Sequence, residues 1–144
     1  MNKPTLIENT YYESDHTYLV TIGTDMGEFT GCAQCEPADY DYESRYFGWE
    51  LAEIKANLQY ARAKRKYYNA QLKSLTEFWR EMSATRNYNV DAFWVKKIRA
   101  KVDDITFSRD WWNDRIKYLK ETYHNKITVF DSSKPIKRKK VKND

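Results

Sequence analysis

Two cysteines and two histidines are the residues of this chain whose types could bind a metal or perform redox chemistry. Cys32 and Cys35 are separated by two residues, and His16 and His124 are the chain's two histidines. A tetrahedral zinc site would need all four side chains, without the spacing usual in zinc-binding motifs. A redox Cys-x-x-Cys pair normally opens a helix, whereas this pair falls in or just after a predicted strand. We therefore interpret both cysteines as structural, and we predict no metal and no cofactor.

Two arginines interrupt apolar heptad patterns and could hold an anion. Arg65 and Arg109 would face each other if the two segments that carry them form antiparallel helices. Two guanidinium groups in one layer repel unless they share an anion or each finds a carboxylate. One hypothesis is therefore an anion site formed by both arginines. The alternative is that both side chains extend out of the seam and only their stems pack.

Basic and aromatic residues alternate on the predicted helices, and such a mixture can bind nucleic acid through phosphates and stacked bases. Small and aromatic residues at outer positions are also expected to be covered by a partner or by another part of the chain. The alternatives are a solvated surface, or a dock for the acidic N-terminal half. The predicted basic and aromatic partner-binding residues are Tyr60, Arg62, Lys64, Lys66, Tyr67, Phe107 and Trp111.

Acidic residues are concentrated in the N-terminal third. Residues 1–53 contain 11 acidic residues against 2 basic ones, and the remainder contains 23 basic residues against 10 acidic ones. This division predicts either that the acidic part docks on the basic part or that the two parts bind different partners. On the second interpretation Asp39, Asp41 and Glu43 are the predicted acidic partner-binding residues.

Two long heptad patterns predict the elements that carry these residues. The first runs from Leu51 to Met82 and the second from Val95 to Tyr123, with no Gly or Pro in either. They predict helices over about 42–83 and about 90–124, which the short connection makes antiparallel. Placing Leu58 opposite Ile116 predicts that facing residues have numbers that sum to 174.

The rest of the chain predicts a small β-structure and a tail. Alternating apolar residues and the turn-forming segment 23–27 predict a β-hairpin over about 17–35, preceded by a loose segment 1–16. Lys126–Phe130 is rich in residues that favour strands and is predicted as a short third strand. Residues 132–144 are predicted to be a basic disordered tail. The expected fold is thus α+β, with the β-hairpin packed on a two-helix coiled-coil hairpin, in a single domain over 1–131.

Several segments resemble small early-region proteins of phages and prophages of Gram-positive bacteria. The likeness rests on Met26-Gly-Glu-Phe-Thr-Gly-Cys-Ala, Pro37-Ala-Asp-Tyr-Asp-Tyr-Glu-Ser, Phe47-Gly-Trp-Glu-Leu-Ala-Glu-Ile-Lys-Ala and Tyr60-Ala-Arg-Ala-Lys. It covers at most residues 18–75. Those proteins mostly lack an assigned activity, so the resemblance implies no functional residues. A phage origin implies a chain that binds host machinery, most sharply an anti-CRISPR protein whose acidic half imitates nucleic acid.

The expected function is therefore binding and not catalysis. The sequence contains no P-loop, Rossmann, HExxH or nucleophile-elbow motif. The predicted partner is a host protein, specifically a nucleic-acid-handling complex in the host cytoplasm, with no membrane contact expected. The alternatives are a nucleic-acid-binding accessory factor for phage replication or recombination, and a self-associating structural protein.

Overall fold

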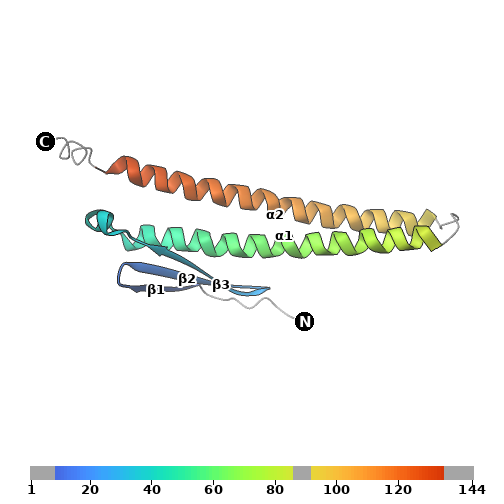
Figure 1. The fold of residues 1–144 in the computed structure, drawn as a ribbon, viewed down its shortest axis with the longest axis horizontal. Helices are drawn as coiled ribbons and strands as arrows, with labels where there is room; N and C mark the ends of the chain where they lie inside the picture. Colours follow the sequence, from blue (N-terminus) through green and yellow to red (C-terminus); the bar gives the residue numbers. More distant parts are fainter. Residues whose placement is uncertain (1–8, 86–91, 135–144) are drawn as a thin grey trace. The chain divides into compact units, whose positions relative to one another are not determined.

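The computed structural model describes residues 9–85 and 92–134. It contains β1 (Thr10–Ser14), β2 (Thr17–Thr24), β3 (Gly27–Gln34), the 3-10 helix η1 (Pro37–Tyr42), α1 (Arg45–Thr85) and α2 (Ala92–Ser133) (Figure 1). The two long helices pack together, which confirms the α+β class and the helical hairpin. The chain divides into two compact units. Unit 1 comprises residues 1–60 and 118–144, and unit 2 comprises residues 61–117.

The sheet of unit 1 has three strands where two were predicted. The strand order is β1-β2-β3, and both neighbouring pairs are antiparallel. Asp15 and His16 form the two-residue turn between β1 and β2 with positive φ angles of 52° and 64°. Positive φ at both central residues is what a tight hairpin turn of this length favours. All five residues of β1 are exposed, so this strand lacks the apolar alternation that identified β2. Part of the segment predicted to be loose is therefore an edge strand.

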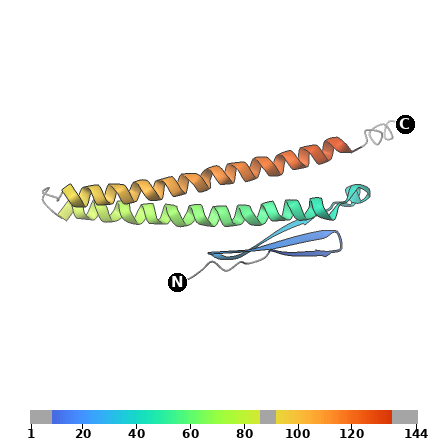
Figure 2. The same ribbon diagram turned by 180° about the vertical axis from the view of Figure 1, so that it is seen from behind.

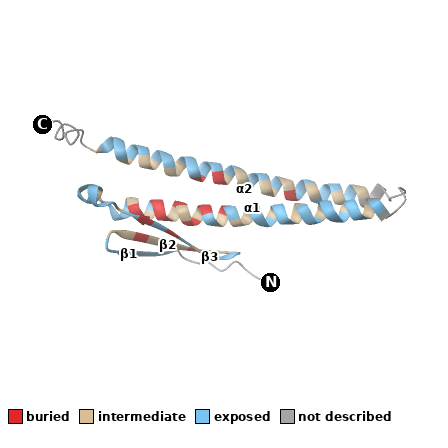
Figure 3. Cartoon of the chain, in the orientation of Figure 1, coloured by how far each residue is buried: buried red, intermediate tan, exposed pale blue. Residues whose placement is uncertain are grey.

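The sheet lies directly on the backbone of α1, within unit 1 (Figures 1 and 2). A Cβ atom added at Gly31 of β3 would lie 1.9 Å from the Ala52 carbonyl oxygen, so only glycine fits there. Likewise, a Cβ atom at Gly48 of α1 would lie 2.4 Å from the Tyr18 ring. Val20 and Ala52 are fully buried members of one core cluster. Figure 3 shows buried segments both in the sheet and in α1. Small residues thus allow sheet and helix to approach closely.

The helix α1 begins close to where the sequence predicted a start. The backbone N–H of Phe47 donates to the Ser44 hydroxyl at 3.3 Å. Ser44 therefore caps the helix, as a serine at this position commonly does. Pro37 opens η1, and the chain turns at Glu43 and Ser44 from η1 into α1.

The prediction of a third strand at Lys126–Phe130 is wrong, because these residues belong to α2. The helical spacing brings Phe130 onto Phe47, where the rings stack at 4.7 Å, and brings Lys126 within 3.4 Å of Glu50. Ile127 packs against the core of unit 1. These tertiary contacts override the strand propensity of the local sequence. Residues 132 and 133, predicted to belong to the tail, also lie in α2.

Polar side chains join the two helices across the hairpin. In unit 2, Arg65 pairs with Asn113 and Asn69 with Arg109, and both pairs have numbers that sum to 178. In unit 1, Glu50 pairs with Lys126, a sum of 176. Side chains on a helix point toward its N-terminus, so contacts with sums slightly above 174 are compatible with the predicted register, which stays a prediction.

Two further predictions concern the extent of the domain and the segments at its borders. The single domain over 1–131 stays a prediction. Residues 1–8 of the predicted loose segment, 86–91 of the connection and 135–144 of the predicted tail lie outside the described residues.

Candidate functional site

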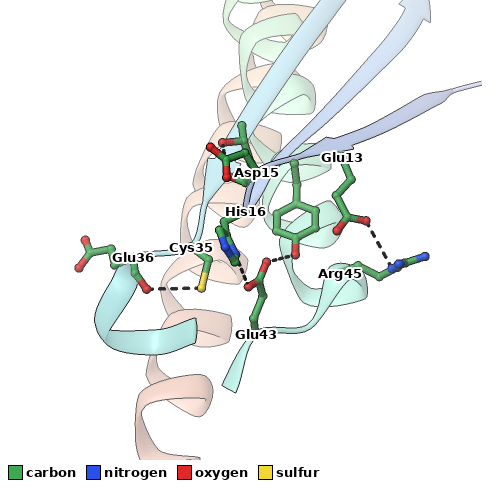
Figure 4. A network of polar contacts seen from close by, with 9 residues as sticks. Glu13, Asp15, His16, Cys35, Glu36, Glu43 and Arg45 are labelled. Atoms are coloured by element: carbon green, nitrogen blue, oxygen red, sulfur yellow. Dashed lines mark hydrogen bonds and ion pairs between the residues drawn. The ribbon is translucent and has the colours of Figure 1, made fainter. Parts of the chain in front are cut away.

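A polar network surrounds Glu43 at one end of the sheet in unit 1 (Figure 4). The turn that contains Asp15 places His16 so that its Nδ1–H donates to the Glu43 carboxylate at 2.6 Å. The Tyr18 hydroxyl donates to the other oxygen of the same carboxylate. The Tyr40 ring of η1 stacks on His16 with ring centroids 3.7 Å apart. The network therefore joins β2, the β1–β2 turn and the segment that leads into α1.

These hydrogen bonds shift the titration of two groups. The bond from Tyr18, followed by the bond from His16, lowers the pKa of the Glu43 carboxyl group. Burial raises the pKa of the Tyr18 hydroxyl, and the adjacent Glu43 raises it further. At neutral pH Glu43 is therefore an ionised carboxylate and Tyr18 a neutral phenol. Their hydrogen bond links β2 to the segment that precedes α1.

The two cysteines are both free thiols and differ in exposure. Cys32 lies in β3 and is exposed, and Cys35 follows the strand and is half-buried. Burial raises the pKa of the Cys35 thiol, with the charge of Glu43 adding to the effect. In the ranges 9–85 and 92–134, no group of His, Cys, Asp and Glu side chains is arranged to hold a metal ion.

Two of the three predicted acidic partner-binding residues have partners within unit 1. Asp39 accepts a hydrogen bond from the Lys134 ammonium group at 2.5 Å, and Glu43 lies in the network described above. Asp41 is exposed. The ion pair of Asp39 with Lys134 agrees with the interpretation that acidic residues dock on basic ones. The role of these residues in binding a partner stays a prediction.

Unit 1 also contains a cavity of about 450 Å³. Phe47, Leu51 and Ile127 contribute apolar side chains to its wall. Lys134 also lines it, and only 10 % of its side chain is exposed. Its ammonium group lies 4.6 Å from the centroid of the Phe130 ring, and its contact with Asp39 raises its pKa. A cavity of this volume suits a small molecule. Within its wall, however, the Lys134 ammonium group already pairs with the Asp39 carboxylate.

Arg65 and Arg109 are held by asparagines in unit 2 and not by each other. Arg65 donates to the Asn113 side chain at 2.9 Å, and Arg109 donates to the Asn69 side chain at 3.1 Å. Arg109 also donates to Asp110 at 2.9 Å. Each arginine thus extends to one side of the seam and spans the two helices. The anion site formed by both stays a prediction.

The predicted basic residues occupy two sides of α1. Arg62 and Lys66 are four residues apart and share a side, whereas Lys64, halfway between them in sequence, points to the other side. There Lys64 lies 5.8 Å from the ring centroids of both Tyr68 and Trp112. The predicted band of basic residues is therefore split between two faces.

The predicted aromatic residues lie in both units. Tyr60 belongs to unit 1, where its hydroxyl donates to Asp25 at 2.5 Å. Phe107 and Trp111 share one side of α2 and are 72 % and 52 % exposed. Tyr67 is 46 % exposed. The role of these residues in binding a partner stays a prediction.

Tyr67 borders a groove in unit 2 between α1 and α2. We call the residues that line this groove of about 330 Å³ the aromatic groove: Tyr67, Ala70, Gln71, Ser74, Leu75, Lys101 and Ile105. Leu75 occupies a seam position but is only half-buried. The groove therefore exposes apolar surface of the kind that a partner protein covers.

The two units carry opposite charge. The described residues of unit 1 include 12 acidic and 5 basic side chains, whereas those of unit 2 include 13 basic and 6 acidic ones. Among the described residues, unit 2 therefore carries the excess of positive charge and unit 1 the excess of negative charge.

Neither a protein-family model, nor a curated protein, nor a solved structure matches the chain. Among the described residues, neither long helix has an apolar stretch sufficient to cross a membrane.

Sequence reasoning missed the roles of His16 and of the two asparagines. Asn69 and Asn113 each stand four residues after an arginine, and this repeated Arg-x-x-x-Asn spacing was a usable signal. In an antiparallel pair the two motifs bond reciprocally when the residue numbers sum to 178. The role of His16 carried no such signal, because it depends on the turn that precedes β2.

Proposed function

We propose that the protein is a non-enzymatic binding protein, encoded by a phage, that attaches to a nucleic-acid-handling complex of its host and inhibits it. In its sharpest form it is an anti-CRISPR protein that blocks a nucleic-acid-guided nuclease in the host cytoplasm. The resemblance to phage early-region proteins supports the origin, and the aromatic groove of unit 2 supports attachment to a protein.

The observation that carries the proposal is the incomplete burial of unit 2. Leu72 and Leu75 occupy seam positions but are half-buried, and Tyr67 is largely exposed beside them. Two helices alone cannot surround a core, so this seam favours a partner that supplies further apolar surface. Among the described residues of this unit, the buried apolar ones are Ala61, Ile105 and Ile116.

The rim of the aromatic groove indicates the chemistry of that partner. Lys101 lines the groove, and Lys64 lies on the same side of α1 as Tyr67. A protein segment with apolar side chains flanked by carboxylates would satisfy both features. The proposal thus places the main contact on unit 2, while Asp39 and Glu43 hold unit 1 together.

A plasmid-interference assay tests this function. The protein is expressed in a Gram-positive host that carries an active nucleic-acid-guided nuclease, and the transformation efficiency of a targeted plasmid is measured. Inhibition should raise this efficiency to that of a plasmid without a target sequence. Replacing Tyr67→Glu should abolish the gain, because a carboxylate would face the acidic, apolar segment of the partner.

Tyr12→Glu is the matched control. Tyr12 is 57 % exposed on β1 in unit 1, so the same substitution there should leave inhibition intact. Copurification of the nuclease after nucleic-acid digestion should follow the same order among the variants. Unchanged transformation efficiency with the wild-type protein would contradict the inhibitor function. A stable dimer that Tyr67→Glu makes monomeric, without any copurified host protein, would instead favour a self-associating assembly protein.

A further inference from the structure

A second surface of unit 2 lies beside the reciprocal Arg–Asn pairs. On α1, basic side chains and Asn69 follow one another at steps of three or four residues and form a continuous row. On α2, Arg109, Asn113 and Lys117 form a second row at steps of four, and the Arg–Asn hydrogen bonds join the two rows. We define the cationic face as the basic residues of both rows: Arg62, Arg65, Lys66, Lys73, Arg109 and Lys117.

The arginines of the cationic face are held in place before any ligand arrives. One N–H group of Arg65 is fixed by Asn113, and one of Arg109 is fixed by Asn69. A guanidinium group has five N–H donors, so each arginine keeps further donors for a second acceptor. Because each guanidinium group is already held in place, binding a ligand costs less conformational entropy.

The remaining cations on α1 are accessible. Arg62, Lys66 and Lys73 are exposed, and none of the three pairs with a carboxylate within residues 9–85 and 92–134. Among the described residues, Asp110 is in contact with the face and lies 2.9 Å from the Nε atom of Arg109. The face therefore keeps an excess of positive charge.

The spacing of the row fits a phosphate backbone. From Arg62 to Lys73 the helix rises by about 16 Å, at ~1.5 Å per residue. A nucleic-acid duplex advances roughly 3.4 Å per base-pair step along each strand, so the row spans about five steps. Several cations can thus contact successive phosphates of one strand.

The aromatic residues lie on the other side of the hairpin. Tyr68 and Trp112 contact Lys64, which points away from Arg62 and Lys66. Single-stranded nucleic acid is usually bound with bases stacked on aromatic rings next to the cations. A face that has cations without rings suits a duplex, whose bases are already stacked and whose backbone is outside.

We propose that the cationic face of unit 2 binds the phosphate backbone of double-stranded nucleic acid, independently of its sequence. This inference goes beyond the proposed function, because it requires no host protein. Together the two surfaces would let one hairpin contact a protein through the aromatic groove and a duplex through the opposite side.

Fluorescence anisotropy with the full chain and a fluorescein-labelled DNA duplex of about 20 base pairs tests this inference. The wild-type protein should bind, and its log affinity should fall linearly with log salt concentration. The double variant Arg62→Gln/Lys66→Gln should bind about tenfold more weakly at low salt. Its salt slope should be smaller in magnitude by about 2, because each lost phosphate contact contributes roughly 0.9.

The double variant Lys97→Gln/Lys101→Gln is the matched control. It removes the same charge from unit 2, again from residues four apart. Lys101 lines the aromatic groove, and Lys97 lies one helical turn away on the same side of α2. Its affinity for the duplex should stay within about twofold of wild type. Both double variants keep the basic residues 137–142, so any contribution of these residues to binding is the same in both.

Three results would overturn the inference. The first is no binding of the duplex at about 50 mM salt. The second is equal weakening in both double variants, which would mean that net charge alone matters. The third is equal displacement of the labelled duplex by poly-glutamate and by unlabelled duplex at matched charge, which would indicate an acidic protein as the ligand. Since only purified components are used, none of these results bears on inhibition of a host nuclease.

Discussion

Unit 1 and unit 2 are built from the same two helices but differ in how completely they are packed. Ten of the thirteen buried apolar residues of the described chain lie in unit 1, and three lie in unit 2. In unit 1 a sheet covers α1, with Gly31 pressed on the backbone at Ala52. Among the described residues of unit 2, each helix packs on the other helix. The described part of unit 1 is therefore packed around a core, whereas seam residues of unit 2 such as Leu72 and Leu75 stay half-buried.

The polar contacts of the two units differ in the same way as their apolar packing. In unit 1, Glu43 and Asp39 are engaged by donors from distant parts of the sequence and tie segments together. In unit 2, Arg65 and Arg109 bridge the helices but keep donors available, and Lys66 is exposed. The charged groups named in unit 1 therefore join segments of the fold. Those named in unit 2 keep hydrogen-bond donors that a further acceptor could use.

The largest effect should come from adding a side chain at Gly31, where β3 lies against the backbone of α1. Gly31→Val should destabilise the protein by about 3 kcal/mol or more, because its Cβ atom would collide with backbone and not with a movable side chain. Chemical denaturation followed by circular dichroism measures this change. Glu28 is an exposed residue of the same strand and provides the control position. Glu28→Val should change the free energy of unfolding by no more than about 0.5 kcal/mol.

Wild-type stability in Gly31→Val would show that the sheet does not press on α1. The contrast between the two units would then rest on the helices alone, and unit 1 would be no better packed than unit 2.

A matched pair of leucines tests the contrast directly. Leu51→Ala in unit 1 should cost about 3 kcal/mol, since its side chain is buried in the core. Leu72→Ala in unit 2 should cost only about 1 kcal/mol, since its side chain already contacts solvent. Denaturation curves at two protein concentrations give both values.

Equal costs for the two leucines would contradict the contrast. If the cost at Leu72 also rises with protein concentration, a second copy of the chain covers the seam of unit 2, and the aromatic groove is a contact between copies.

The helices could be predicted from the sequence because their signal is long and repeated. Two long heptad patterns, each interrupted by one arginine, specified both helices, and the predicted start at about residue 42 lies close to the start of α1 at Arg45. The strand β1 could not be found, because all five of its residues are exposed and show no alternation. The end of α2 was mistaken for a strand because Thr128 and Val129 favour strands locally. The contact of Phe130 with Phe47, which decides the structure there, becomes visible only in three dimensions.

The candidate sites were predicted as residue types and not as arrangements. The sequence identified Arg62, Lys64 and Lys66 as one basic group, although helical geometry places Lys64 on the other side of α1. It also placed Arg65 and Arg109 opposite each other, but it missed that each arginine reaches the asparagine four residues after the other arginine.

The smallest of these effects concerns Glu43, whose contribution to the packing of unit 1 should depend on pH. Its pKa is lower in the folded protein than in the unfolded chain, so the unfolded chain binds the proton more readily. The stabilisation is therefore present above the unfolded pKa of about 4.3 and is lost as the pH falls through the folded pKa. Glu43→Gln should flatten the acid limb of a plot of unfolding free energy against pH.

Tyr18→Phe should flatten the same limb, because the Tyr18 hydroxyl is the main cause of the shift. Thermal unfolding at pH values from about 6 down to about 3 measures both variants, a range that brackets the unfolded pKa. An acid limb as steep as that of wild type in both variants would mean that Glu43 does not tie β2 to the start of α1. Unit 1 would then be held by its apolar contacts alone, and the contrast with unit 2 would lie in packing and not in charge.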